Sequence, residues 1–194
     1  MKNLTYENET FTGYCLENET AESCSFTDCK FVDCTVSECT FTRCTFDSCT
    51  FENCRISDIK SSYTTVNFCI FTYCRLSGIN WRLFLAEVPL ANPVEKLTDC
   101  RLRYNTFYKM NFTRFDFTGS DITASSFTEC TLSSANFKGC DLTGTDFFRC
   151  DLAKADFRNA SGYRIGIADC KLKNARFSYP DVMSLLDSLE IKID

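Results

Sequence analysis

The sequence predicts an all-β solenoid, in which short strands wind into stacked coils. Large apolar residues recur every five positions from Tyr6 to Trp81 and again from Leu97 to Phe177, as in CSFTD CKFVD CTVSE CTFTR CTFDS (24–48). This period fits neither a 3.6-residue helix nor an extended strand with a period of two. It fits a coil that turns a corner every five residues with one large side chain inward on each side. Stacked coils would then bury a continuous apolar column.

A second inward position lies two residues before each large one and usually holds a small side chain. Every cysteine except Cys15 falls on this position. The spacing is C-x₄-C and never the C-x₂-C of zinc ribbons, so we expect buried, free cysteines that pack as small hydrophobes and bind no metal.

Composition excludes several functional classes. The chain has 194 residues, a formal charge of −5 and no His, which removes the commonest general base and the catalytic triads built on it. No nucleophile–base pair or glycine-rich phosphate loop stands out, so we expect a protein that is not an enzyme and uses no cofactor. An acidic chain is a poor direct ligand for nucleic acid. No apolar run reaches bilayer length, and residues 1–20 do not read as a secretory signal, so we expect a cytoplasmic protein without membrane contact.

The repeats resemble those of the pentapeptide-repeat family, whose pattern is a small residue, a polar one, Leu or Phe, and two polar ones. The stretch ANFKG CDLTG TDFFR CDLAK ADFRN (135–159) matches this pattern closely. The resemblance implies a right-handed quadrilateral β-helix with about 20 residues per coil, so that residues 20 apart stack.

The register divides the chain into four parts. We expect N-terminal coils over 1–81, an interrupting loop over 82–96, C-terminal coils over 97–178 and a helix or strand cap over 179–194. Two interpretations of the loop remain: it absorbs an irregular coil, or it protrudes as a recognition loop. Gly162, a non-apolar residue on the register, marks a distorted last coil.

The C-terminal segment predicts a capping helix with one apolar face. A solenoid end must be covered, and the segment either caps a monomer or forms a homodimer interface. We favour the homodimer, as the resemblance implies. The face consists of Val182, Leu185, Leu186 and Leu189.

The acidic excess lies in residues 1–81, whereas acids and bases balance over the remainder. Stacking by 20 places Glu38 beside Asp58, with Glu17 nearby. Such a surface either keeps the solenoid soluble or binds a cationic partner. The candidate acidic face comprises Glu17, Asp28, Asp33, Glu38, Asp47, Glu52 and Asp58.

Within the family, the tail ARFSYPDVMSLLDSLEIKID (175–194) is similar to those of Qnr-type and albicidin-resistance-type proteins. That resemblance implies a dimeric DNA mimic that binds DNA gyrase or topoisomerase IV and protects it from quinolones or a natural gyrase poison. The alternative is a protein-interaction scaffold with no topoisomerase role. B-DNA carries about one charge per 1.7 Å, so a net charge of −5 restricts any mimicry to a patch.

Overall fold

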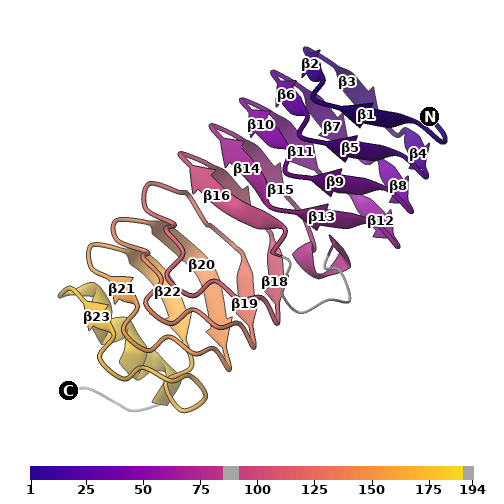
Figure 1. The fold of residues 1–194 in the computed structure, drawn as a ribbon. Coiled ribbons are helices and arrows are strands. Elements are labelled where there is room, and N and C mark those ends of the chain that lie inside the picture. The colour runs from indigo at the N-terminus through magenta and orange to yellow at the C-terminus, as the bar shows by residue number, and fades with distance from the viewer. Residues whose placement is uncertain (85–91, 190–194) are drawn as a thin grey trace. The chain divides into compact units, whose positions relative to one another are not determined.

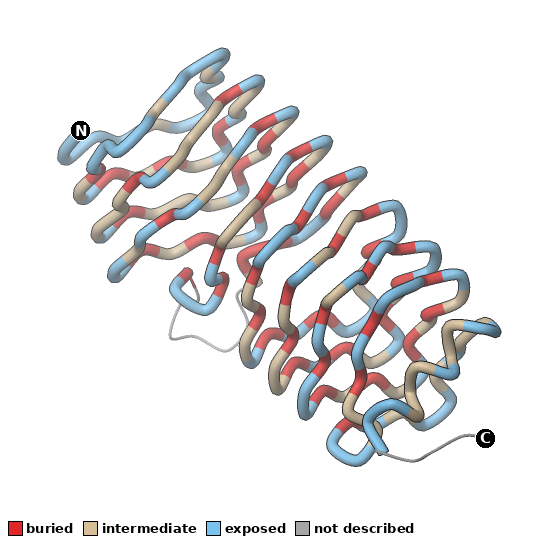
Figure 2. The backbone as a smooth tube through the Cα atoms, turned by 180° about the vertical axis from the view of Figure 1, so that it is seen from behind, coloured by how far each residue is buried: buried red, intermediate tan, exposed pale blue. Residues whose placement is uncertain are grey.

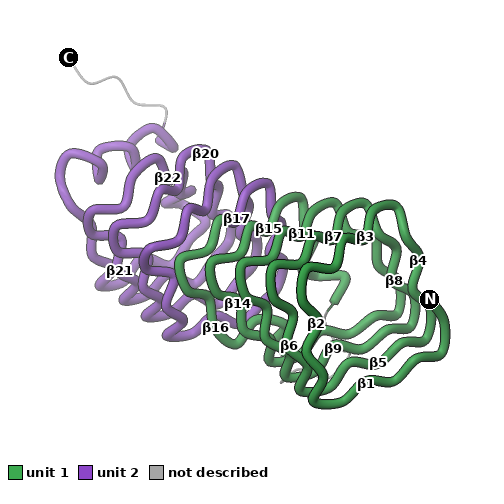
Figure 3. The backbone as a smooth tube through the Cα atoms, turned by 90° about the horizontal axis from the view of Figure 1, so that it is seen from above, with its two compact units in different colours: residues 1–101 green, residues 102–194 purple. Residues whose placement is uncertain are grey.

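The computed structural model describes residues 1–84 and 92–189. The chain forms two compact units, unit 1 over Met1–Arg101 and unit 2 over Leu102–Asp194 (Figure 3). Strand β17 (Arg101–Arg103) lies where the two units meet in the chain. Each unit is a parallel β-solenoid, which confirms the predicted fold class.

Unit 1 has four sheets, each named here after its first strand (Figure 1). Every strand except β16 pairs with the strand 20 residues away, as in the partners Phe26 and Phe46, which confirms the coil length. The strands of the β1 sheet are β1 (Thr5–Glu7), β5 (Ser25–Thr27), β9 (Thr45–Asp47) and β13 (Thr65–Asn67). Those of the β2 sheet are β2 (Thr10–Thr12), β6 (Lys30–Val32), β10 (Thr50–Glu52), β14 (Cys69–Thr72) and β16 (Val94–Thr98). The β3 sheet contains β3 (Cys15–Glu17), β7 (Thr35–Ser37), β11 (Arg55–Ser57) and β15 (Arg75–Ser77). The β4 sheet consists of β4 (Thr20–Glu22), β8 (Thr40–Thr42) and β12 (Lys60–Ser62).

The corners of unit 1 explain why a five-residue repeat closes into a coil. The residue two positions after each inward side chain has left-handed backbone geometry, with φ of 53° at Asp28 and at Glu38. One such residue per repeat turns the chain from one sheet to the next. The preceding strand keeps its large residue inward because neighbours on a strand point to opposite faces.

The interruption in unit 1 is partly regular. The 3₁₀ helix η1 covers Trp81–Phe84, and β16 begins at Val94, inside the segment 82–96 for which the sequence predicts a loop. The β16 register against β14 shifts by one residue between Cys69 and Ile70, which absorbs one of the extra residues of this coil. The remaining part of the expected loop, 85–91, lies outside the described residues.

The corners of unit 2 also have a left-handed residue, with φ of 61° at Arg114, but many of them add a hydrogen bond from a side chain. Asn111 Oδ1 accepts a hydrogen bond from the Thr113 main-chain N–H at 3.1 Å, and Phe115 N–H donates to Phe112 O at 3.1 Å. The same side-chain bond recurs at Asp116, Asp141 and Asp156, so Asp and Asn before the inward residue stabilise the turn. Its strands are β18 (Thr106–Tyr108), β19 (Ser126–Thr128), β20 (Asp141–Phe148), β21 (Asp156–Phe157), β22 (Ser161–Ile165) and β23 (Arg176–Phe177).

Stacked rings fill the core of unit 2. Phe107, Phe127 and Phe147 form one column, with ring centroids 4.5 Å and 4.9 Å apart. A second column joins Phe117 to Phe137 at 4.7 Å, and rings of the two columns meet edge to face. These side chains are at most 2% exposed (Figure 2). The distorted last coil lies at β22, where the register against β20 shifts and Tyr163 becomes the buried residue in place of Gly162.

The C-terminal element is the 3₁₀ helix η2 (Asp181–Leu189), which packs against β22. Before this helix, the Ser178 hydroxyl accepts a hydrogen bond from Asn159 N–H at 3.2 Å. The Ile191–Ile193 alternation, which could have formed a strand, lies outside the described residues.

Candidate interaction surface

The predicted acidic residues occupy three neighbouring sheets of unit 1, which corrects the expectation of a single acidic face. Glu17, Glu38 and Asp58 belong to the β3 sheet or the corner that follows it; Asp28 and Asp47 belong to the β1 sheet and its corner; Asp33 and Glu52 belong to the β2 sheet and its corner. The cause is that each side of a coil is five residues long. Acids five residues apart therefore lie on different sheets, and only acids about 20 residues apart lie on the same sheet.

The corner after the β3 sheet carries the closest like-charge stack. Glu38 and Asp58 occupy equivalent left-handed positions on consecutive coils, both exposed, with φ of 53°. Glu38 N–H donates to Ser57 O, and Asp58 N–H donates to Ser77 O, each at 3.1 Å. The exposed bases Arg55 and Arg75 begin strands β11 and β15 of the same sheet, but among the described residues neither Glu38 nor Asp58 forms an ion pair.

The remaining four acids differ in whether a hydrogen-bond donor or a basic side chain contacts the carboxylate. Asp28 N–H donates to Asp47 O at 3.0 Å, which brings these two acids together on adjacent coils. Asp33 accepts a hydrogen bond from Asn53 Nδ2 at 2.6 Å. Glu52 forms an ion pair with Lys30 at 2.7 Å, so it is the one member of the predicted set with a basic partner among the described residues.

In unit 2, more of the acidic side chains form ion pairs with Lys or Arg than in unit 1. Arg103 lies 2.7 Å from Asp121, Lys109 lies 3.4 Å from Glu129, and Lys171 lies 3.8 Å from Asp151. Hydrogen bonds from the Arg158 side chain hold the pKa of Asp156 below its usual value. Uncompensated negative charge is therefore concentrated in unit 1.

Exposed aromatic corners are a feature that the sequence reasoning missed, and three of them lie on one coil of unit 1. Tyr63, Phe68 and Tyr73 occupy successive left-handed corners of that coil, and they are 84%, 45% and 59% exposed. Bulky side chains rarely adopt this backbone geometry. The signal in the sequence was the large residue two positions after the inward one, where most repeats of unit 1 carry Asp, Asn, Ser or Glu.

The cysteines behave as packing residues. All 15 are free, and all except Cys15 are buried. Their thiols donate to main-chain carbonyls of their own coil or the preceding one, as Cys49 does to Phe26 O at 3.4 Å. Burial raises the pKa of Cys140 to about 12, which keeps that thiol protonated and unreactive at neutral pH.

Across residues 1–84 and 92–189, no group of three or more His, Cys, Asp or Glu side chains could hold a metal ion. None of the described helices is long and apolar enough to cross a membrane.

The predicted dimerisation residues lie on η2 and retain apolar exposure. Val182, Leu185 and Leu186 are half-buried, and Leu189 is 44% exposed. Because residues three apart eclipse in a 3₁₀ helix, Leu186 and Leu189 share an edge with Met183, whereas Val182 and Leu185 share another. This arrangement differs from the single face expected of an α-helix.

Comparison with known proteins places these features in context. Residues 96–160 and 110–182 match a family model described as a pentapeptide repeat region, and residues 21–59 match a model of nine pentapeptide repeats. A trypsin-treated form of QnrB1, a plasmid-mediated fluoroquinolone resistance protein, is 17% identical, with coverage of 100% of this chain and 99% of that one and a TM-score of 0.45. HetL, a pentapeptide repeat protein involved in heterocyst differentiation regulation from the cyanobacterium Nostoc sp. strain PCC 7120, is 14% identical over 90% of this chain and 85% of its own, with a TM-score of 0.42. No curated protein matches the chain.

Proposed function

Because this chain belongs to the pentapeptide-repeat family, we propose that it works by binding another protein, and that this partner is a type II topoisomerase such as DNA gyrase. In this proposal the chain acts without catalysis as a DNA mimic. It occupies the DNA-binding surface of the enzyme and protects the enzyme from a quinolone or a natural gyrase poison, and it does so as a homodimer in the cytoplasm.

The observation that carries the proposal is the uncompensated acidic surface of unit 1. A surface that binds DNA presents Lys and Arg to phosphates and therefore attracts ordered negative charge on any ligand. Glu38 and Asp58 occupy equivalent corners of consecutive coils, whose backbones are about 4.8 Å apart. Like charges held this close destabilise the coil slightly, so a surface that keeps them is suited to a cationic partner.

The test is a gyrase supercoiling assay with added protein, with and without a quinolone and, separately, albicidin. QnrB1 is described as a fluoroquinolone resistance protein, so a quinolone is the first drug to try. We expect the protein to restore supercoiling in the presence of one drug. We also expect the double variant Glu38→Lys/Asp58→Lys to lose this rescue, because it reverses the sign of the β3 corner.

The matched control is Glu129→Lys/Asp146→Lys. It makes the same change in net charge on two carboxylates of unit 2 that already have basic partners, the half-buried Glu129 and the exposed Asp146. Rescue should survive in this control. A folded wild-type dimer that has no effect with either drug would contradict the topoisomerase proposal and favour an interaction scaffold without that role.

A further inference from the structure

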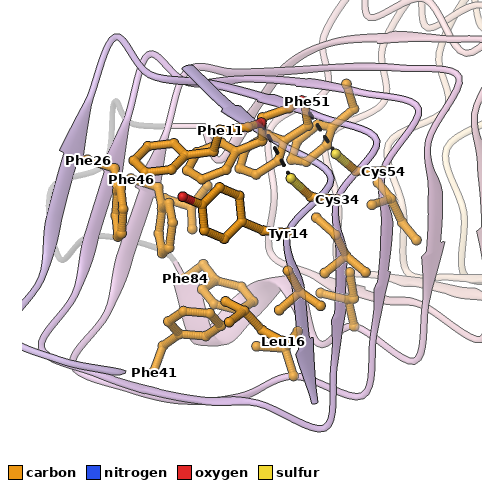
Figure 4. Close-up of a pocket in the computed structure, with 18 of the residues that line it drawn as sticks. Phe11, Tyr14, Leu16, Phe26, Cys34, Phe41, Phe46, Phe51, Cys54 and Phe84 are labelled. Atoms are coloured by element: carbon orange, nitrogen blue, oxygen red, sulfur yellow. Dashed lines mark hydrogen bonds between the residues drawn. The ribbon is translucent and has the colours of Figure 1, made fainter. Parts of the chain in front are cut away.

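The interior of unit 1 contains an apolar bore of about 200 Å³, lined by side chains of this unit from Met1 to Phe84 (Figure 4). Protein interiors rarely leave voids larger than a water molecule, and an apolar cavity of roughly 150 Å³ is already large enough to bind benzene. A void of this size therefore departs from the usual close packing of a protein interior.

The burial of equivalent side chains shows the contrast. In unit 2, the inward residues Phe117, Phe127 and Phe137 are 0% exposed. In unit 1, Val36 and Phe46 occupy the same register position and are only half-buried, although coils lie on both sides of them. Their exposed surface faces the bore.

The sequence explains why unit 1 stays open. Most of its rings come from two adjacent sheets, the β1 and β2 sheets, where Phe26 stacks on Phe46 at 4.9 Å and Phe31 on Phe51 at 4.8 Å. The β3 and β4 sheets opposite them supply one ring, Phe41 on β8, and several smaller inward residues. These are Leu16, Val36, Ile56, Ala21 and Ser61.

One end of the bore is closed and the other is accessible. At the inner end, Leu76, Trp81 and Phe84 are each at most 6% exposed. At the first coil, Tyr6, Phe11 and Leu16 line the bore and are half-exposed. With coils about 4.8 Å apart, a bore through four coils is on the order of 15 Å deep, which suits a slender chain better than a rounded molecule.

The mouth of the bore is acidic and aromatic. Glu9, Tyr14 and Glu19 occupy, in the first coil, the register position that holds an inward cysteine in the coil below, and all three are exposed. Figure 4 shows the Tyr14 ring projecting toward the open centre, with its centroid 5.7 Å from that of Phe11. The cations of this coil are engaged, since Lys2 pairs with Glu22 at 2.6 Å and the Met1 amine donates to Thr20 O at 2.7 Å.

We propose that this bore is a binding site for a slender cationic amphiphile, whose hydrocarbon tail lies among the rings of unit 1 and whose ammonium group lies at the rim formed by Glu9, Tyr14 and Glu19. The tail gains by leaving water for an apolar channel. The ammonium gains from two carboxylates and from the faces of aromatic rings. A carboxylate or sulfate headgroup would be repelled there. The site lies in the bore and its rim and is independent of the proposed topoisomerase contact.

The test is titration calorimetry on the full chain with decyltrimethylammonium below its micelle concentration. Decanoate carries the opposite charge on a similar tail, and tetramethylammonium carries the headgroup alone. We expect saturable binding near one equivalent for decyltrimethylammonium, about tenfold or more weaker binding of decanoate, and no detectable binding of tetramethylammonium. Non-saturable uptake, or decanoate binding as tightly as the cation, would overturn the proposal.

Two sets of variants place the ligand. Val36→Phe fills the bore and should weaken binding of the cation about tenfold or more. Val32→Phe makes the same substitution on the outer face of the β2 sheet and should leave binding unchanged. Glu9→Gln/Glu19→Gln should bring the affinities for the cation and decanoate close together while the tail still binds.

A second variant and a measurement on the wild type keep the test decisive if Val36→Phe does not fold. Ile56→Phe fills the bore from the next coil if Val36→Phe does not fold, and circular dichroism verifies each variant. In the wild type, nuclear Overhauser effects should connect the tail methylenes to the rings of Phe31 and Phe51. A folded bore-filled variant that binds like the wild type, or methylene contacts confined to outer residues, would show that the bore is not the site.

Discussion

The backbone of Gly162 lies directly over Thr143 in the preceding coil of unit 2. A Cβ placed on Gly162 would come within 2.6 Å of Thr143 Cα and 2.7 Å of Thr143 Oγ1, and the φ of Gly162 is +71°. Only glycine satisfies both the left-handed geometry and the close approach. This contact allows the next residue, Tyr163, to enter the core at 1% exposure where the five-residue register would have placed residue 162.

We therefore expect Gly162→Ala to destabilise the protein by about 2–4 kcal/mol, because it adds backbone strain to a clash with main-chain atoms that cannot move aside. Gly139→Ala is the control: its φ is +70°, but no atom lies within 4 Å of the added Cβ. That variant should lose about 1 kcal/mol. Urea unfolding followed by circular dichroism measures both, and equal losses would mean that the Thr143 contact contributes nothing.

The second prediction uses two neighbouring phenylalanines on β20. Phe147 is 2% exposed and stacks on Phe127, whereas Phe148 is 41% exposed, with the Arg149 guanidinium 4.9 Å from its ring centroid. Phe147→Ala leaves a cavity in the aromatic column and should cost about 3–5 kcal/mol. Phe148→Ala should cost roughly 0.5–1 kcal/mol, the size of an exposed cation–π contact. Similar urea midpoints for the two variants would contradict the assigned register.

The third prediction concerns low pH. Arg158 donates to both carboxylate oxygens of Asp156, with its Nε 2.9 Å from Oδ1 and its Nη2 2.6 Å from Oδ2. These bonds, together with the nearby charge of Arg176, hold the pKa of Asp156 below its usual value. A carboxyl whose pKa is lower in the folded state adds stability above its unfolded pKa of about 3.9, and this stability is lost as the pH falls through the folded pKa.

Asp156→Asn retains an oxygen to accept from Arg158 N–H but removes the charge. We expect a loss of about 1 kcal/mol at pH 6, the usual upper size of a partly exposed ion pair. The loss should be smaller at pH 2 than at pH 6, because it disappears as the pH falls through the lowered pKa of Asp156 and the wild-type carboxyl is protonated. Urea midpoints of both proteins at the two pH values test this, and a loss that does not change with pH would exclude the ion pair as its cause.

The fourth prediction concerns self-association. If η2 forms the homodimer interface, Leu189→Arg should convert the dimer to a monomer, because it places a charge on an apolar edge that would be desolvated at the interface. Phe148→Arg is the control, since this side chain is similarly exposed, at 41% against 44% for Leu189, and lies on β20. Sedimentation equilibrium distinguishes the two states. A wild-type monomer, or a Leu189→Arg variant that remains dimeric, would count against the predicted interface.

The sequence by itself determined the solenoid, the inward register and the burial of the cysteines. These follow from local chemistry, since one large and one small apolar residue in every five have no other way to leave water together. The stacking of Glu38 with Asp58 and of Asp121 with Asp141 also follows from the coil length, and the structure has both.

Only the tertiary structure decided which acids share a face, whether the core is full, and how the last coil closes. The sequence predicts that the seven acidic residues form one surface, but the corners of the coils distribute them over three sheets. The bore exists because two adjacent sheets supply most of the rings and, apart from Phe41, the other two supply smaller residues, and that relation joins residues from different coils. Tyr163 replaces Gly162 in the core because of the close contact with Thr143. Each of these outcomes depends on packing between residues distant in the chain, which a local repeat does not encode.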